Sequence, residues 1–190
     1  MQLGVRLVGG DIARKRLRNI GAKPEPVLRG ALNTTATKAR TDRYVKPLSR
    51  TIRPQRLRAA MRVKRANARR LNARIIPSSS GVLVVNYRTW GFDVIDATRA
   101  RIWVMGPLGR KIAAGFVNPS SQNRLPMRTR SSKQKGSKAY SYQLPLQLAQ
   151  GPSAAYWFKQ LTTGQSIRWI NAFLQQEFEK RIRREIAKLI

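Results

Sequence analysis

The stretch 167–189, IRWINAFLQQEFEKRIRREIAKL, gives the clearest structural signal in the chain. Its apolar residues recur at steps of three and four, so they form one stripe along an α-helix. The pairs Glu177–Arg181 and Glu179–Arg183 are four apart in the favourable order, and each supports a helix by roughly 0.2–0.5 kcal/mol. We predict a long amphipathic C-terminal helix that docks on a sheet or on a neighbouring subunit. The stripe consists of Ile167, Ile170, Leu174, Phe178, Ile182, Ile186 and Leu189.

Working backwards, the other helices are marked by their start and stop residues. Gly151–Pro152–Ser153 predicts the start of a short helix that runs to about Leu161. Pro54 is suited to open another, ending near Met61. A longer helix is predicted from Pro26 to about Lys46, ended by Pro47. Asp11 is a candidate N-cap for a helix to about Ile20. The predicted core face of the longer helix is Leu28, Leu32, Thr35, Ala36 and Ala39.

Strand signals occupy the middle of the chain. Leu71–Ile76 and Val82–Tyr87 flank a turn-forming segment and predict a hairpin. Two further strands, residues 101–104 and 112–117, surround a Gly-Pro-Leu-Gly turn. Residues 140–148 alternate between apolar and polar side chains, which is typical of a half-buried strand, and Pro145 favours an edge position.

These elements predict an α+β fold: a small antiparallel sheet with N-terminal helices and a long amphipathic C-terminal helix packed on it. The length of 190 residues suits one domain, since single cores are commonly built from about 100–200 residues. We expect residues 1–190 to form that domain, with residues 1–25 a flexible N-terminal arm. The Ser-, Gln-, Arg- and Lys-rich residues 118–138 are expected to be a mobile basic loop.

The charge balance predicts an anionic partner. The chain has 39 Lys and Arg against 8 Asp and Glu, a formal net charge of +31. Phosphates, acidic protein surfaces or anionic lipid would relieve the self-repulsion. No apolar run approaches the roughly 18–20 residues that span a bilayer, and residues 1–10 lack the order of a signal peptide. We therefore expect a soluble, non-exported protein with no membrane partner.

The sequence contains few residues suited to catalysis. The chain has no Cys and no His, which excludes Cys/His zinc sites, disulfides, thiol nucleophiles and Ser-His-Asp triads. Asp93 and Asp96 lie three apart, but no other carboxylate is near them in sequence. No glycine-rich loop suited to cradling a nucleotide phosphate is found. We predict a non-enzymatic protein with no catalytic residues, metal or cofactor.

Residues 50–74 hold ten basic residues and no acidic one. An ordinary solvated surface mixes both signs, so this window favours contact with phosphates or with an acidic partner. No helix-turn-helix, zinc-finger or RNP motif is present, and DNA contact is therefore expected to be with the backbone and independent of sequence. The residues predicted to face DNA or an acidic partner are Arg50, Arg53, Arg56, Arg58, Arg62, Lys64, Arg65, Arg69 and Arg70.

The aromatic residues have two interpretations. They could stack on bases of a single strand, but most lie in apolar-periodic segments and are better assigned to the core or to subunit contacts. An exposed edge at residues 140–148 could accept a neighbouring subunit. The predicted interface residues are Tyr140, Tyr142, Leu144 and Leu146.

Several short segments, taken in order, resemble the minor tail protein Z family, the tail completion proteins of long-tailed bacteriophages. They are residues 31–40 (ALNTTATKAR), 61–66 (MRVKRA) leading into 71–75 (LNARI), 114–117 (AGFV), and 144–146 (LPL) before 151–153 (GPS). The resemblance covers roughly residues 26–190 and rests on order rather than on one diagnostic residue. The family's Arg-rich strand corresponds to residues 127–130 (MRTR), although the loop before it departs from the family's compact turn.

The resemblance implies a structural virion protein at the head-proximal end of the tail, present as a ring or in many copies. Its expected partners are other copies of itself, the tail terminator, tail tube and head-tail connector proteins, and packaged DNA. The expected location is the virion neck, with the host cytoplasm during assembly. The alternative from a different class is a general sequence-independent nucleic-acid-binding protein, ribosomal- or nucleoid-like. An enzyme acting on nucleic acid is disfavoured because the carboxylates are too scattered to hold a metal.

Overall fold

The computed structural model describes residues 3–5, 15, 24–97, 100–133 and 140–188. The chain forms two compact units, each built from more than one segment. The first unit takes in residues 1–47, 58–78 and 158–190, and the second takes in residues 48–57 and 79–157. The chain enters and leaves each unit more than once, and the single domain stays a prediction. The α+β class is confirmed, with small antiparallel sheets and a long C-terminal helix.

The long N-terminal helical segment starts earlier and ends later than predicted. Helix α2 (Pro24–Ala39) begins with two prolines in its first turn, where their missing N–H groups are not needed. A π-helical segment, η1 (Arg40–Val45), follows, and the N–H of Lys46 donates to the carbonyl of Thr41, five residues back. Helix α3 (Lys46–Ser49) then includes Pro47, so the predicted end at Pro47 was wrong.

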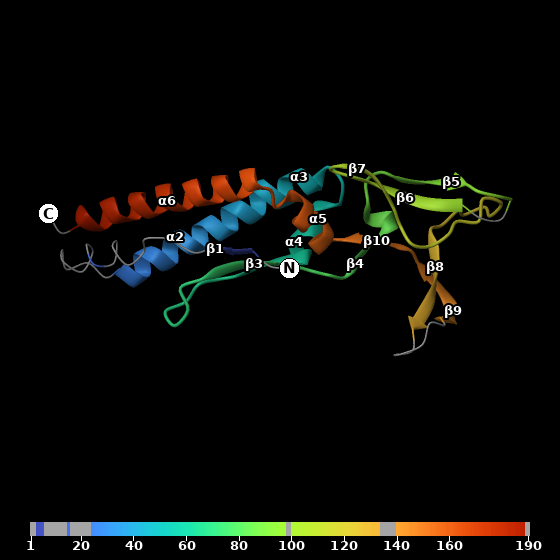
Figure 1. The fold of residues 1–190 in the computed structure, drawn as a ribbon, viewed down its shortest axis with the longest axis horizontal. Coiled ribbons are helices and arrows are strands. Elements are labelled where there is room, and N and C mark those ends of the chain that lie inside the picture. The colour runs from blue at the N-terminus through green and yellow to red at the C-terminus, as the bar shows by residue number, and fades with distance from the viewer. Residues whose placement is uncertain (1–2, 6–14, 16–23, 98–99, 134–139, 189–190) are drawn as a thin grey trace. The chain divides into compact units, whose positions relative to one another are not determined.

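The buried face of α2 contains all five residues predicted for it, Leu28, Leu32, Thr35, Ala36 and Ala39. Helix α6 (Gly164–Ile186) lies along α2 in the first unit (Figure 1). The small side chains of α2 allow the two backbones to approach closely. Residues Ile170, Leu174 and Phe178 of the predicted stripe are buried, whereas Ile167 is 43% exposed and Ile186 is 38% exposed.

The start of α6 is fixed by a side-chain cap. Thr163 has an extended backbone, and its hydroxyl oxygen accepts a hydrogen bond from the N–H of Ser166. This is the preferred way to satisfy a free N–H group in the first turn of a helix. The aromatic core beside it is formed by Tyr44 and Phe158, whose ring centroids are 4.2 Å apart.

A three-stranded antiparallel sheet completes the first unit, in the order β1 (Leu3–Val5), β3 (Ala73–Pro77), β2 (Met61–Lys64). The predicted hairpin between Leu71–Ile76 and Val82–Tyr87 was wrong, since β3 pairs with β2. Strand β4 (Gly81–Leu83) pairs instead with β10 (Gln150–Ser153), far away in sequence. Turn residues between two strands show where the chain reverses, but not which strand becomes the partner. Of the expected N-terminal arm, β1 forms part of the sheet. In the helix predicted from Asp11, only Lys15 is described, and it is helical; the other residues of that helix lie outside the described part of the chain.

The second unit contains a meander of β5 (Trp90–Val94), β6 (Ala100–Gly106) and β7 (Gly109–Ile112). The predicted turn between β6 and β7 is confirmed, and its Gly109 has a φ of +105° that a side chain would disfavour. The strand expected to run on to Val117 ends at Ile112, and only isolated bridges follow it. Short helical pieces at the unit boundaries are α4 (Pro54–Ala60) and α5 (Ala154–Leu161), with the 3₁₀ turn η2 at Val84–Asn86.

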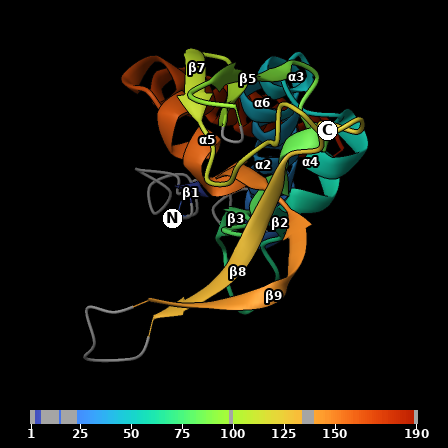
Figure 2. The same cartoon turned by 90° about the vertical axis from the view of Figure 1, so that its right-hand side faces the viewer.

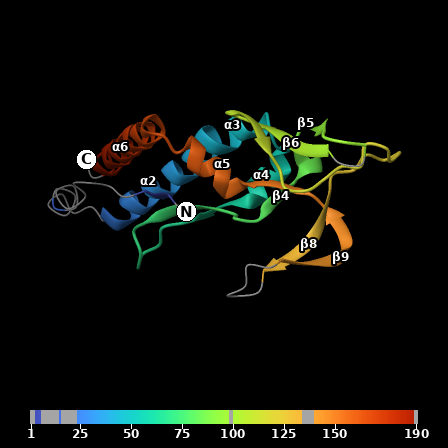
Figure 3. The ribbon, with the colours of Figure 1, turned by 45° about the vertical axis from the view of Figure 1, so that its right-hand side comes forward.

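The segment 118–138, expected to be a mobile loop, contains strand β8 (Met127–Lys133). It pairs antiparallel with β9 (Tyr140–Leu148), the strand predicted from alternation. The two strands form a ribbon that stands apart from the β5–β6 strands (Figures 2 and 3). The loop prediction was therefore wrong for Met127–Lys133, because cross-strand backbone pairing with β9 forms a strand that the polar composition of the segment did not indicate.

A buried polar cluster holds the second unit together. The hydroxyl of Tyr87 donates to the carbonyl of Pro152 at 2.6 Å and accepts from Nε1 of Trp157 at 2.9 Å. Both aromatic side chains are buried, and burial raises the pKa of Tyr87 to about 12. The Trp157 ring lies directly against Gly106, where a Cβ atom would collide with it.

The substitution Tyr87→Phe should lower the free energy of unfolding by about 2–3 kcal/mol, because it leaves the buried indole N–H of Trp157 and the half-buried carbonyl of Pro152 without this partner. The tyrosine pKa is raised in the folded state, so this stabilisation is complete below about pH 10 and is lost as the pH rises towards 12. The difference between the two proteins should therefore shrink over that range. Denaturant titration followed by tryptophan fluorescence measures it.

The control is Tyr156→Phe, which removes the same atom from a half-buried ring that lies edge-on to Trp157. It should change stability by less than about 0.5 kcal/mol. Equal losses in the two variants would contradict the role given to the Tyr87 hydroxyl.

Candidate interface for an anionic partner

All nine residues predicted to face DNA or an acidic partner are exposed. They do not belong to a single unit. Arg50, Arg53 and Arg56 lie in the second unit, and the other six lie in the first. The densest group surrounds the β2–β3 hairpin of the first unit, which we call the basic hairpin (residues 61–77).

Strand alternation gives the basic hairpin one apolar face and one cationic face. Met61, Ala73 and Ile75 are buried. Arg62 and Lys64 of β2 point to the opposite side and are exposed. That outer face is therefore cationic as a direct result of the period-two geometry of the strands.

The register places two cations opposite each other. Lys64 pairs with Arg74, whereas Arg62 pairs with Ile76. Like charges directly opposite on one face destabilise a sheet. A pair of this kind is expected where an anionic partner offsets the repulsion, which favours a functional role for the outer face.

The loop of the basic hairpin is held from both sides. The Asn33 side chain on α2 accepts from the N–H of Ala66 at 2.7 Å and donates to its carbonyl at 3.1 Å. At the tip, the Asn67 side chain accepts from the N–H of Arg70 at 2.8 Å. Arg65, Arg69 and Arg70 are thus presented by a fixed backbone.

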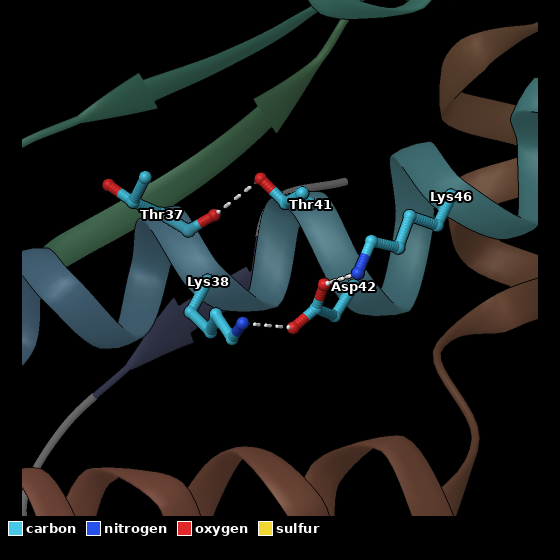
Figure 4. A network of polar contacts seen from close by, with 5 residues as sticks. All are labelled: Thr37, Lys38, Thr41, Asp42 and Lys46. Carbon is cyan, nitrogen blue, oxygen red and sulfur yellow. Dashed lines mark hydrogen bonds and ion pairs between the residues drawn. The ribbon is translucent and has the colours of Figure 1, made fainter.

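Asp42 of η1 pairs with two lysines on its own helical segment. Its two carboxylate oxygens contact Lys46 at 2.7 Å and Lys38 at 2.9 Å (Figure 4). These two ammonium groups, Lys46 first, hold the pKa of Asp42 below its usual value. On the other side of the same helix the Thr41 hydroxyl donates to the carbonyl of Thr37 at 3.1 Å (Figure 4).

The sequence did not identify the cationic residues that α2 and α6 bring together. Arg181 was expected only as a helix-supporting partner of Glu177, and the two do pair at 2.8 Å. The structure also brings its Nη2 atom to 2.9 Å from the hydroxyl of Thr34. A separation of 147 residues leaves no sequence signal for this contact.

Strand β9 contains all four predicted interface residues, Tyr140, Tyr142, Leu144 and Leu146. The side chains of the first three lie outside the described part of the structure, and Leu146 is 45% exposed. The β8–β9 ribbon pairs with no other described strand, except for one isolated β-bridge between Met127 of β8 and Phe116. The ribbon therefore has open backbone edges.

Asp93 takes part in a surface cluster rather than an acid pair. Its Oδ1 atom accepts from Nε1 of Trp103 at 3.2 Å and from Arg110 at 3.3 Å. The Arg110 guanidinium also lies 3.8 Å from the Trp103 ring centroid, a cation–π contact. These contacts explain Asp93 as a structural residue of the meander.

The substitution Lys64→Glu should raise the free energy of unfolding by up to about 1 kcal/mol, because it replaces a like-charge pair with an attractive one opposite Arg74. The gain should fade in high salt. Arg62→Glu is the matched control, since it makes the same charge change on the same face opposite Ile76. Thermal denaturation at low and high salt compares them. Equal stabilisation by both would mean that overall charge, not the cross-strand pair, is responsible.

Within the described residues, no helix is long and apolar enough to cross a membrane. The same residues contain no group of three or more His, Cys, Asp or Glu side chains that could hold a metal ion. No family model matches the chain, and no curated protein or solved structure is significantly similar to it. Function is therefore inferred from the residues and their geometry.

Proposed function

We propose that this chain is a structural virion protein, a tail completion or neck component at the head-proximal end of a phage tail. In this role it assists head-tail joining and the passage of DNA through sequence-independent electrostatic contact. Its partners are further copies of itself in a ring, the tail terminator, tail tube and head-tail connector proteins, and packaged DNA. Assembly takes place in the host cytoplasm.

The basic hairpin is the observation that carries the proposal. Its outer face has Arg62, Lys64 and Arg74 with no acidic residue among them, and it retains a repulsive cross-strand pair. Guanidinium and ammonium groups contact phosphates without reading bases. Contact of this kind permits DNA to slide, which suits a conduit.

The β8–β9 ribbon supports assembly into a larger structure. Strands with unpaired edges accept a strand from another chain by backbone hydrogen bonding. Such edges are usually blunted in proteins that remain monomeric. Charged residues such as Arg128 on β8 reduce, but do not remove, this capacity.

The resemblance to the minor tail protein Z family points in the same direction. A ring of subunits, each with a formal charge of +31, would form an attractive collar for emerging DNA. The alternative, a general nucleic-acid-binding protein, accounts equally well for the basic hairpin. It gives no role to the open ribbon.

The first test is the mass of the purified protein, measured by light scattering across a salt series with and without duplex DNA of unrelated sequences. We expect a closed oligomer that binds these duplexes with equal, salt-sensitive affinity. A monomer that binds one nucleic acid tightly and selectively would overturn the proposal and favour the alternative.

A second test reverses charge on the basic hairpin, with Arg62→Glu, Arg69→Glu and Arg70→Glu combined. The slope of log affinity against log salt should fall by roughly 3, about 0.9 for each lost phosphate contact, while the oligomer mass stays the same. The control is the triple reversal of exposed residues on α6, Arg168→Glu, Lys180→Glu and Arg183→Glu. Equal loss of slope in both would mean that net charge alone drives binding.

A further inference from the structure

An open groove of about 480 Å³ lies in the first unit, with its floor on α2 and η1. Arg65 from the hairpin loop and Arg181 from α6 line it together with the floor residues. None of its described lining residues is acidic, and three are cationic, Lys38, Arg65 and Arg181. The charge is therefore concentrated in a concave site, where field lines are focused more strongly than on a flat face.

Three threonines follow one another along the floor of this groove. Thr34, Thr37 and Thr41 are three and four residues apart, so their side chains lie on neighbouring turns of one helix face. The Thr34 hydroxyl accepts a hydrogen bond from Arg181, which leaves its own proton free to donate. Hydroxyl protons next to guanidinium groups are donors suited to an oxyanion.

Arg181 is held in place at one side of the groove. Its Nε atom donates to Glu177 at 2.8 Å and its Nη2 atom donates to Thr34 at 2.9 Å. The guanidinium lies so close to Gly30 that a Cβ atom there would collide with it. Gly30 therefore admits the Arg181 side chain to the α2 backbone, and the guanidinium needs little reorganisation to bind an anion.

Arg65 lies at the other side and is free to bind. The residue after it, Ala66, is the one clamped by Asn33 through two hydrogen bonds. Among the described residues, the Arg65 guanidinium forms no ion pair or hydrogen bond. A fixed backbone therefore presents an unneutralised cation to the groove.

The nearby carboxylates are already neutralised. Asp42 is contacted by both Lys38 and Lys46, and Glu177 is contacted by Arg181. Neither Asp42 nor Glu177 is a lining residue. Two lysines face the single carboxylate of Asp42, so this cluster keeps a net positive charge beside the groove.

We propose that this groove is a binding site for phosphate oxyanions, with Arg65, Arg181 and the Thr34 and Thr37 hydroxyls as its ligands. The shared chemistry is a tetrahedral phosphate group, carried either by free phosphate or by a nucleic-acid backbone. The site is distinct from the outer face of the basic hairpin, and it does not depend on the virion role.

The test is calorimetric titration of the full-length protein with inorganic phosphate at fixed ionic strength. We expect saturable binding that Arg65→Gln weakens by about tenfold, the usual loss for one charge-assisted hydrogen bond. Thr37→Val should weaken binding by a smaller factor with little change in fold, as checked by circular dichroism. Asp42→Asn should tighten binding, because it releases Lys38 and removes a negative charge.

Arg69→Gln is the matched control, since it removes the same charge from the same hairpin at a residue outside the groove. It should bind inorganic phosphate like the wild type. Equal weakening by Arg65→Gln and Arg69→Gln, or no saturable binding by the wild type, would overturn the proposal.

A second arm identifies the source of the phosphate. If the groove binds a nucleic-acid backbone, short duplex DNA should displace inorganic phosphate and Arg65→Gln should weaken both. If it binds free phosphate, the duplex should leave phosphate binding unchanged. Both outcomes support a phosphate site, and neither depends on the oligomer mass that tests the proposed function.

Discussion

The buried face of α2 is the contact on which the first unit depends. Helix α6 lies along it, and strands β1 and β3 also contact it. The helix can pack against a second helix and a sheet because Ala31, Ala36 and Ala39 are small and fully buried. Close packing holds α2 rigidly against its neighbours. The solvent-facing residues of α2 therefore keep fixed positions relative to the hairpin loop and to α6.

The same packing also places cationic side chains at defined positions beside α2. Asn33 on α2 ties down the hairpin loop, and Gly30 on α2 admits Arg181 from α6. The cations beside α2 are therefore ordered by the core beneath them. The outer face of the hairpin differs, because there the strand register alone sets Lys64 against Arg74. The groove beside α2 is a concave site that suits a single anion, whereas the outer face of the hairpin is an extended cationic surface.

The second unit combines an aliphatic core, which includes Ile52, Ile102 and Val104, with a buried hydrogen bond between aromatic side chains. Tyr87 and Trp157 share a hydrogen bond in its interior, and Gly106 makes room for the indole. The strands of the β8–β9 ribbon pair mainly with each other. A ribbon with open edges gains stability from a further strand, which another subunit could supply.

The sequence by itself determined the elements whose signal is local. Period-three-and-four spacing identified α6 and the core face of α2, alternation identified β9, and proline and glycine marked α4 and the β6–β7 turn. It also identified the exposed basic window, because ten cations without an acid cannot be buried. Only the tertiary structure decided the strand partners, the packing of α6 on α2, and the groove that joins Thr34, Arg65 and Arg181. These contacts link residues far apart in the chain, and the period of a single segment contains no information about its distant neighbour.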